Sequence, residues 1–187
     1  MKLLTERLVL RSLQPRDAGS LAAQANNLNV SQYLLLVKYP YNLRDARTFI
    51  ASCRKKAQKR AGEEYNFGIQ QKGKPGIIGM ISLSKIDRSQ GTAEIGYWLG
   101  ELFWRQGIMS EALKSILDFA FLTKKLRRID IAAFVENAAS NALIRKMGFR
   151  YEGLRKEKAR AKSTGKVHDE YVYGMLKREW MKKRSRV

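Results

Sequence analysis

Apolar and polar residues repeat with a period of two in some segments of the chain and with a period of about 3.6 in others, which is typical of mixed α/β structure. The two-residue period predicts strands, and the longer period predicts helices with one apolar face. The predicted strands cover residues 8–10, 64–71, 76–83, 92–99, 128–135, 150–157 and 167–176. The predicted helices cover about residues 15–26, 43–60, 107–123 and 138–147.

The strands at 92–99 and 128–135 stand on either side of the helix that begins at Gly107. Such a βαβ unit places its two strands parallel and joins them by a right-handed crossover. No internal repeat and no long flexible linker divides the chain. We therefore expect a single α/β domain over residues 1–187.

The composition is that of an ordinary soluble protein. Hydrophobic residues make up 44% of the chain and charged residues 29%, which excludes a disordered polypeptide. No apolar run is long enough to span a bilayer, and residues 1–13 mix charged and apolar side chains without a signal-peptide core. We therefore expect no membrane partner and a cytoplasmic location.

Cys53 and His168 are the only residues of their types in the sequence. A single cysteine forms no disulfide within the chain, and zinc sites use several histidines or cysteines, so we expect no metal. Cys53 falls on the apolar face of the helix at 43–60, which indicates a core position rather than a nucleophile. His168 stands in a polar stretch with no nucleophile motif nearby, so it is expected at the surface, at the entry of a strand.

The net charge of +20 is the strongest signal in the composition. It indicates either a partner that is anionic over a large surface, such as RNA or the ribosome, or a strongly basic proteome. No aromatic residues alternate with the basic clusters in the manner of a platform that stacks single-stranded bases. Most of these clusters are therefore expected to be solvated surfaces. They lie at residues 54–56, 124–125, 127–128 and 182–184.

The step from the strand at 92–99 into the helix at Gly107 carries candidate chemistry. The first turn of a helix offers unpaired backbone N–H groups and the positive end of a dipole, and both suit a phosphate. Gly107 removes a side chain at the point where a ligand would approach the backbone. One glycine before a helix is common, so these properties alone indicate only a candidate phosphate site.

This segment resembles the acetyl-CoA motif of the GNAT N-acetyltransferases, in the form found in the RimJ/RimL group, which acetylates protein N-termini. The resemblance continues over nearly the whole chain, in the same order along the sequence. The matching runs are Thr5-Glu6-Arg7-Leu8-Val9-Leu10-Arg11, Glu94-Ile95-Gly96-Tyr97-Trp98, Ser110-Glu111-Ala112, Asn137-Ala138-Ala139-Ser140, Lys146-Met147-Gly148-Phe149, and the closing strands from Glu152-Gly153 to Trp180.

The resemblance implies the GNAT fold, in which a mixed twisted sheet of about seven strands has flanking helices and one splayed parallel pair. It also implies acetyl-CoA as cosubstrate. The splayed strands would be those at 92–99 and 128–135, with pantetheine hydrogen-bonded to the backbone around Trp98 and Leu99. Asn137 would reach the pantetheine arm. The pyrophosphate would lie on the backbone amides of Arg105, Gln106, Gly107, Ile108, Met109 and Ser110.

Two residues are candidates for acid–base catalysis. The resemblance places a carboxylate at Glu94 beside the thioester, as a base that acts through water; the alternative is a strand carboxylate neutralised by a neighbouring arginine. Many GNAT enzymes protonate the leaving thiolate with a tyrosine at the position of Ile144, so Ser140 becomes the candidate acid here. The alternative for Ser140 is a hydrogen bond to the backbone in the first turn of its helix. Arg105 also departs from the family pattern, which usually has a small residue there.

The sequence leaves the acceptor open. The leading hypothesis is transfer of an acetyl group to the N-terminal α-amine of a ribosomal or other protein. A polyamine or an aminoglycoside is a second hypothesis, and the basic charge disfavours it unless a local acidic patch forms. That patch would consist of Glu63, Glu64, Glu101 and Asp169. A third hypothesis is a ribosome- or RNA-binding protein that has kept the fold without activity. The acceptor pocket would lie between the loops at 29–40 and 163–173, and the family admits a homodimer.

Overall fold

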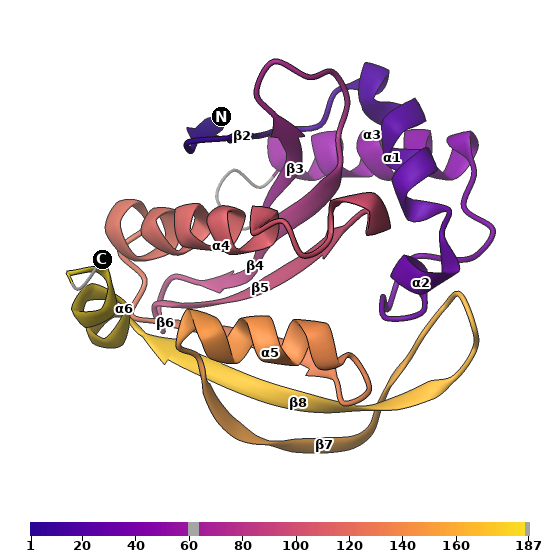
Figure 1. The fold of residues 1–187 in the computed structure, drawn as a ribbon. Coiled ribbons are helices and arrows are strands. Elements are labelled where there is room, and N and C mark those ends of the chain that lie inside the picture. The colour runs from indigo at the N-terminus through magenta and orange to yellow at the C-terminus, as the bar shows by residue number, and fades with distance from the viewer. Residues whose placement is uncertain (60–63, 186–187) are drawn as a thin grey trace.

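One mixed sheet of eight strands forms the centre of the molecule in the computed structural model, which describes residues 1–59 and 64–185 (Figure 1). The strands lie in the order β1-β2-β3-β4-β5-β6-β8-β7. Neighbouring strands pair antiparallel except β5 and β6, which are parallel. The strands are β1 Lys2–Leu4, β2 Leu8–Arg11, β3 Tyr65–Gln71, β4 Gly79–Asp87, β5 Thr92–Leu99, β6 Arg128–Phe134, β7 Arg150–Arg160 and β8 Val167–Leu176.

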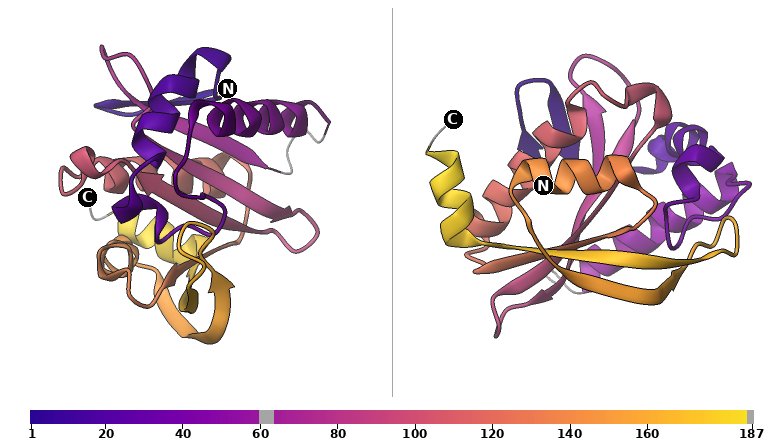
Figure 2. Two further views of the ribbon diagram at one scale, coloured as in Figure 1. Left: turned by 90° about the vertical axis from the view of Figure 1, so that its right-hand side faces the viewer. Right: turned by 60° about the horizontal axis from the view of Figure 1, so that its bottom comes forward.

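Helices cover both faces of this sheet. Side chains of α4 (Ile108–Asp118) and α5 (Ala138–Met147) pack with strand residues in the larger core, whereas α1 (Ala18–Ala25) and α3 (Leu43–Lys59) form a smaller core on the opposite face. The β1–β2 and β7–β8 hairpins lie at opposite edges of the sheet (Figure 2). The remaining elements are the 3-10 helices Pro15–Asp17 and Glu101–Phe103, α2 Leu28–Ser31, the π-helix Phe119–Thr123 and α6 Lys177–Arg184.

The parallel pair β5 and β6 separates part-way along its length. Three residues of β5, beginning at Thr92, pair with three of β6, and this pairing ends at Glu94 and Asp130. Beyond these residues β5 continues to Leu99 along β4, whereas β6 stays paired with β8. The backbone groups that face the resulting gap have no ladder partner, so the splayed parallel pair implied by the resemblance is present.

The α/β fold class and the βαβ unit are confirmed, and the sheet has eight strands rather than about seven. The additional strand, β1, has three residues, which are too few to show a period. The two short helices α2 and α6 were not predicted either. α2 is about one turn long, and α6 is mostly charged, with Trp180 as its buried residue. Short elements of this kind depend on tertiary contacts rather than on a pattern.

Several boundaries differ from the prediction. β4 begins at Gly79 rather than at Gly76, because Gly76 has a left-handed φ of 84° that ends the preceding turn. β7 extends to Arg160, beyond the predicted end at 157. The predicted helix at 107–123 consists of α4 and the π-helix that follows it. The predicted end of the second helix near Arg60 lies outside the described residues.

Glu111, in the first turn of α4, ties the turn between β1 and β2 to this helix. Its carboxylate accepts hydrogen bonds from the Thr5 hydroxyl at 2.5 Å, from the Arg7 backbone N–H at 2.8 Å and from Arg7 Nε at 2.6 Å. Burial opposes ionisation, but these hydrogen bonds outweigh it and hold the pKa of Glu111 below its ordinary value. The start of α4 is therefore fixed to the N-terminal hairpin.

The substitution Glu111→Gln is expected to lower the free energy of unfolding by about 1.5–3 kcal/mol near neutral pH, because hydrogen bonds to a charged acceptor are the stronger kind. The folded-state pKa lies below the unfolded value of about 4.3, so this stabilisation is complete above that value and is lost as the pH falls through the folded-state pKa. Urea unfolding of both proteins at about pH 7 and about pH 3 measures the difference. An equally large difference at both pH values would contradict the role given to the carboxylate.

Candidate active site

The gap between β5 and β6 is lined on one side by backbone groups of β5. Gly100 donates its N–H to the carbonyl of Ile78, on the β4 side, at 2.8 Å. Backbone groups alternate between the two sides of a strand, so this bond directs those of Tyr97 and Leu99 into the gap and those of Trp98 toward β4. The register therefore favours Tyr97 and Leu99, rather than Trp98, as residues whose backbone meets a ligand.

Two tryptophans shape the end of β5. The indole of Trp104 donates a hydrogen bond of 2.7 Å to the Leu99 carbonyl, so Leu99 keeps its N–H for a ligand. The side chain of Trp98 packs against the smaller core, on the face of α1 and α3. Both rings therefore hold the strand end in place, and neither is arranged as a base-stacking platform.

The loop before α4 contains two residues in the left-handed region. Gly107, the N-cap, has a φ of 74°, and Arg105 has a φ of 59°. This conformation costs a residue with a side chain about 1 kcal/mol or more, which explains why the family usually has a small residue at position 105. Ile108 and Met109 bury their side chains. The amides from 108 to 110 have no partner within the helix, because the first helical bond is donated by Glu111.

The Arg7 guanidinium lies beside this loop. It donates to the Gln106 carbonyl at 3.0 Å, and a Cβ built on Gly107 would lie 3.4 Å from its second terminal nitrogen. A fixed cation therefore adds to the positive end of the α4 dipole, in a position that favours an anionic group. Sequence reasoning missed this residue, since Arg7 and Gly107 are far apart along the chain.

A hydrogen bond joins β5 to α5 across the gap. Asn137 is the N-cap of α5, and its Oδ1 accepts the backbone N–H of Ser140 at 3.1 Å. The Ser140 hydroxyl lies 2.8 Å from the Tyr97 hydroxyl. Ser140 therefore does not form the backbone hydrogen bond considered as its alternative; its oxygen faces the phenol of a residue beyond the last paired position of β5.

The phenol of Tyr97 stays protonated at neutral pH. Burial raises its pKa to about 12, against the opposing effect of the hydrogen bond with Ser140. Ile144, where many members of the family have a tyrosine, is fully buried. The structure thus brings a different phenol to the gap. The sequence carries Tyr97 within a recognised motif, but only the fold shows that its hydroxyl meets Ser140.

Glu94 is the last residue of β5 that pairs with β6. Since strand side chains alternate, it lies on the opposite face of the sheet from Tyr97. Its carboxylate is 2.8 Å from the Lys85 ammonium, and its side chain is 42% exposed. The partner is thus an exposed lysine rather than the arginine considered above, and the carboxylate is itself partly exposed to solvent.

The two singleton residues have structural positions. Cys53 is partly buried against the smaller core, and burial raises the pKa of its thiol to about 11, so the core interpretation is confirmed. The prediction of a surface His168 is wrong, because its side chain is 5% exposed. Its ring stacks on Phe134 at 4.3 Å, and Nδ1 lies 3.2 Å from a Glu136 oxygen. The polar neighbours misled the prediction, since strand alternation turns this one side chain inward.

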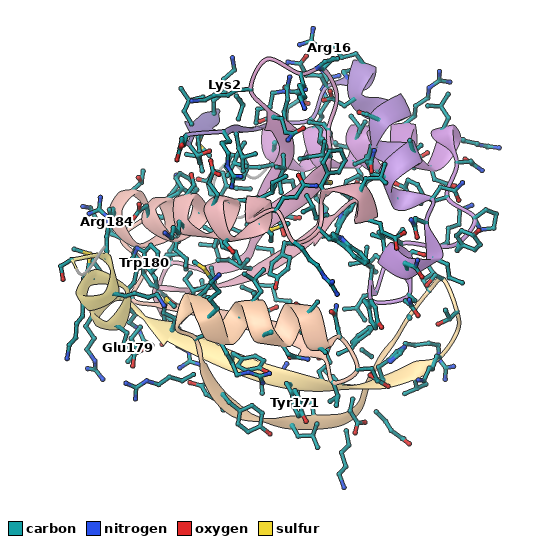
Figure 3. All side chains as sticks on the ribbon, viewed as in Figure 1. Lys2, Arg16, Tyr171, Glu179, Trp180 and Arg184 are labelled. Carbon is teal, nitrogen blue, oxygen red and sulfur yellow. The ribbon has the colours of Figure 1, made fainter. Side chains whose placement is uncertain are left out.

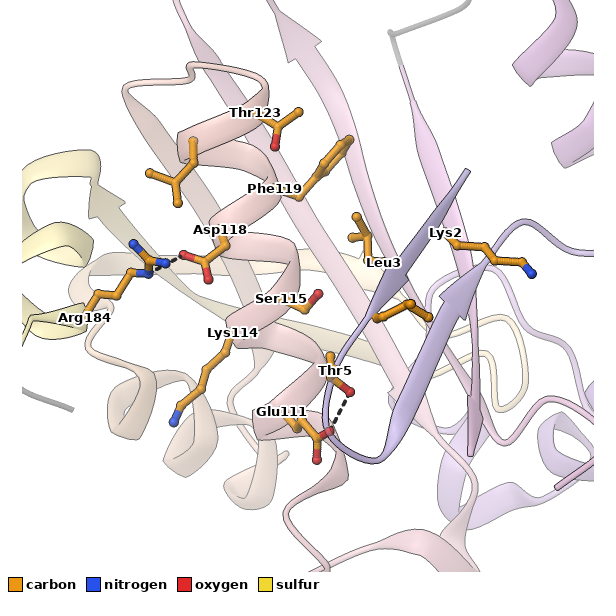
Figure 4. Close-up of a pocket in the computed structure, with 12 residues that line it drawn as sticks. Lys2, Leu3, Thr5, Glu111, Lys114, Ser115, Asp118, Phe119, Thr123 and Arg184 are labelled. Carbon is orange, nitrogen blue, oxygen red and sulfur yellow. Dashed lines mark hydrogen bonds and ion pairs between the residues drawn. The ribbon is translucent and has the colours of Figure 1, made fainter. Parts of the chain in front are cut away.

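A separate groove lies between the β1–β2 hairpin and α4 (Figure 4). It has a volume of about 570 Å³, and Lys2, Thr5, Lys114 and Arg184 are among its lining residues. The residues that line this groove include none from β5 or β6, so it is distinct from the β5–β6 gap. Over residues 1–59 and 64–185, no group of three or more metal-ligating side chains is present. Nor does that part of the chain contain a helix with the length and apolar character needed to cross a membrane.

Comparison with known proteins agrees with this geometry. A family model described as an acetyltransferase (GNAT) domain matches residues 7–150. The chain is 33% identical over 178 residues to the uncharacterized N-acetyltransferase p20 of Bacillus licheniformis, covering 95% of this chain and 97% of the relative. It is 33% identical over 180 residues to the putative ribosomal N-acetyltransferase YdaF of Bacillus subtilis (strain 168), covering 95% of each.

A solved structure of RimL, described as a ribosomal L7/L12 alpha-N-protein acetyltransferase in complex with coenzyme A, superposes with a TM-score of 0.83. That match has 26% sequence identity and covers 94% of this chain and 98% of the other. The family model alone spans more than half of the sequence. The chain therefore belongs to the GNAT family of acetyltransferases and is an acetyl-CoA-dependent N-acetyltransferase.

Proposed function

We propose that this enzyme acetylates the N-terminal α-amine of a ribosomal protein. The observation that carries the proposal is the β5–β6 gap, which opens toward the first turn of α4 and is crossed by the Tyr97–Ser140 hydrogen bond. Relatives supply the acceptor class: YdaF is named a putative ribosomal N-acetyltransferase, and RimL acts on the α-amine of L7/L12 by its description. A ribosomal acceptor implies action in the cytoplasm.

Acetyl-CoA suits the gap by charge and by hydrogen-bonding capacity. The pyrophosphate would lie on the amides from Gln106 to Ser110, with the guanidinium groups of Arg7 and Arg105 as counter-charges. The pantetheine amides would pair with the backbone of Tyr97 and the N–H of Leu99. The side-chain N–H₂ of Asn137 remains for the pantetheine arm, because its oxygen caps α5.

Glu94 is the proposed base. An α-amine has an ordinary pKa near 8 and a lysine near 10.4, so an N-terminus loses its proton about 2 units more readily. The exposed carboxylate of Glu94 would take the proton of the attacking amine through a water molecule. The new bond joins the amine nitrogen to the acetyl carbon, and the bond between that carbon and sulfur breaks.

Ser140 is the proposed acid for the departing thiolate. Tyr97 would position the Ser140 hydroxyl and replace the proton that it gives up. The Ser140 hydroxyl would pass its proton to sulfur and receive the phenol proton of Tyr97, at a separation of 2.8 Å. A phenol is a stronger acid than a serine hydroxyl even with its pKa raised, so the pair is a better donor than Ser140 alone.

The structure supports a protein acceptor over a small polycation. The acidic residues that would have gathered into a patch are held on separate elements: Glu64 pairs with Lys56, and Asp169 accepts the Glu157 N–H. Glu101 accepts bonds from two asparagine side chains near α2. Glu63 lies outside the described residues.

The entry for a peptide would lie between α2 and the loop joining β7 to β8. The Ser163 hydroxyl of this loop donates to the Ser31 carbonyl of α2 at 2.9 Å, so the two segments proposed for the acceptor pocket are in contact. Tyr33 packs nearby against a small apolar cluster with Phe134 and Ala161. An extended N-terminus could approach Glu94 from this side of the sheet.

Acceptor class is tested by thiol release from acetyl-CoA with ribosomal-protein N-terminal peptides, the same peptides carrying a blocked α-amine and an internal lysine, spermidine, and an aminoglycoside. We expect turnover with free N-termini and loss of turnover when the α-amine is blocked. Mass spectrometry of treated ribosomes then identifies the acetylated protein. Faster turnover of spermidine or the aminoglycoside than of every peptide would overturn the proposed acceptor and leave the enzyme class intact.

The substitution Glu94→Gln is expected to lower kcat by about 10²–10³ while leaving the Kd for acetyl-CoA within about twofold, because the carboxylate acts on the amine and not on the cofactor. Raising the pH above the amine pKa of about 8 should recover part of the lost rate, since the acceptor then arrives neutral. The matched control is Glu64→Gln, which alters another lysine-paired carboxylate away from the gap. Equal turnover of Glu94→Gln and wild type at saturating substrates would remove Glu94 from the mechanism.

The substitution Ser140→Ala is expected to reduce kcat by about 10–100-fold. Tyr97→Phe should cause a smaller loss, and the double variant should be no slower than Ser140→Ala alone, because Tyr97 acts through Ser140. Steady-state kinetics of the three variants, with thermal melting to check folding, gives the comparison. Fully additive losses would show that Tyr97 and Ser140 act independently.

A further inference from the structure

The outer edge of the sheet carries an unneutralised basic surface. β7 is the last strand of the sheet, and residues 155–162, its second half and the start of the following loop, contain five exposed cations and one acid. Among the described residues, none of these five cations has a carboxylate partner. Most of the acidic side chains elsewhere in the described chain are already held in ion pairs or hydrogen bonds. We call the five the β7 basic face: Arg155, Lys156, Lys158, Arg160 and Lys162.

A bulge pushes the middle of the β7 basic face away from the ladder. Between the pairs at Arg155 and Ala159, three residues of β7 stand opposite Asp169 alone. The Asp169 carboxylate accepts the N–H of Glu157 at 2.7 Å, and Glu157 has a left-handed φ of 46°. The lysines on either side of Glu157 are exposed. The bulge is therefore fixed by a specific contact and displays its lysines to solvent.

β7 also carries an exposed aromatic ring near its start. Tyr151 is 54% exposed and meets the rings of Tyr171 and Tyr173 edge-to-face at 5.4 and 5.8 Å. Arg145 of α5 donates to the Tyr173 hydroxyl at 3.2 Å, which brings another cation beside the group. The sequence shows no alternation of aromatic and basic residues here, because α5, β7 and β8 each contribute one part.

Cations of α5 and α6 lie beside the start of β7, and its other end leads toward α2. At the start, Arg150 pairs with Glu179 of α6 at 2.8 Å, and Lys183 donates to the Lys146 carbonyl at 2.7 Å. Glu179 and Arg184 lie on α6, which follows β8, whereas Tyr171 lies near the middle of β8 (Figure 3). At the other end, β7 leads into the loop that contacts α2. A chain lying along β7 would thus reach the proposed acceptor entry.

Two explanations fit a lysine-bearing bulge on an edge strand. Lysines and bulges protect sheet edges from pairing with other chains, and this use needs no ligand. Protection of the sheet edge does not account for the exposed Tyr151 or for the cations of α5 and α6 beside the strand. We propose that the β7 basic face and Tyr151 bind single-stranded RNA and thereby hold a ribosomal acceptor near the gap; this rests on the proposed function for its purpose, but not for the binding itself.

The test is binding of a fluorescently labelled single-stranded RNA of about 20 nucleotides, measured by anisotropy over a range of salt concentrations. The triple variant Arg155→Ala, Lys156→Ala, Lys158→Ala should lower the slope of log K against log salt by about 2, because each phosphate contact on a single strand contributes about 0.7. Tyr151→Ala should lower affinity by about fivefold or more with little change in slope.

The matched control removes three exposed cations from α3, on the other side of the sheet, by Arg47→Ala, Arg54→Ala and Lys55→Ala. It changes the net charge equally, so it should bind RNA with the wild-type slope. Equal losses in the α3 and β7 variants would show diffuse charge attraction and overturn the proposed surface. Aggregation or dimerisation of the β7 triple variant, seen by analytical ultracentrifugation without an RNA effect, would assign the lysines to edge protection instead.

The same variants separate this inference from the proposed function. All of them should acetylate free peptides at the wild-type rate, since none touches the gap. Acetylation of intact ribosomes should fall in the β7 triple variant alone. Wild-type RNA binding by that variant would overturn the proposed RNA surface without affecting the proposed peptide activity. RNA binding by the wild-type protein without any peptide acetylation would instead overturn the proposed acceptor.

Discussion

The candidate active site depends on the point at which β5 and β6 stop pairing. A parallel pair normally satisfies its backbone groups along its full length, but here the ladder ends after Glu94 and Asp130. Pairing with β4 fixes β5 as far as Leu99, so the backbone groups of Tyr97 and Leu99 that face the gap stay unpaired with β6. A cosubstrate with amide groups along a thin chain can supply the missing partners. The unpaired backbone groups of β5 are therefore the feature that makes this gap a candidate cosubstrate site.

The second requirement is a fixed positive region where the gap meets α4. The helix start supplies amides and a dipole, but a loop with two left-handed residues needs support. Glu111 provides it by binding Thr5 and Arg7, and the same contact brings the Arg7 guanidinium to the loop. Glu111 thus fixes the N-terminal hairpin to the start of α4, and through this contact an arginine of the hairpin reaches the loop before α4.

Acidic and basic side chains differ in how many of them have partners, although both are spread widely along the sequence. Many acidic side chains are committed to particular partners, such as Asp17 to Arg11 in a buried ion pair and Asp169 to the β7 bulge. The excess basic side chains lie unpaired on the surface, and several of them are on β7, which also carries the exposed Tyr151. The basic edge strand leads into the loop between β7 and β8, which contacts α2, so the RNA surface and the acceptor entry that we propose adjoin one another.

The sequence by itself determined the α/β class, the βαβ unit, the long helices and the family, because these rest on periods and motifs that are local along the chain. It also pointed to Glu94, Ser140 and the loop at Gly107, although their roles stay predictions. Only the tertiary structure decided that Tyr97 faces Ser140, that Arg7 reaches Gly107 and that His168 is buried. Such contacts join segments far apart in sequence, and they follow from strand register and helix packing, which no local pattern encodes.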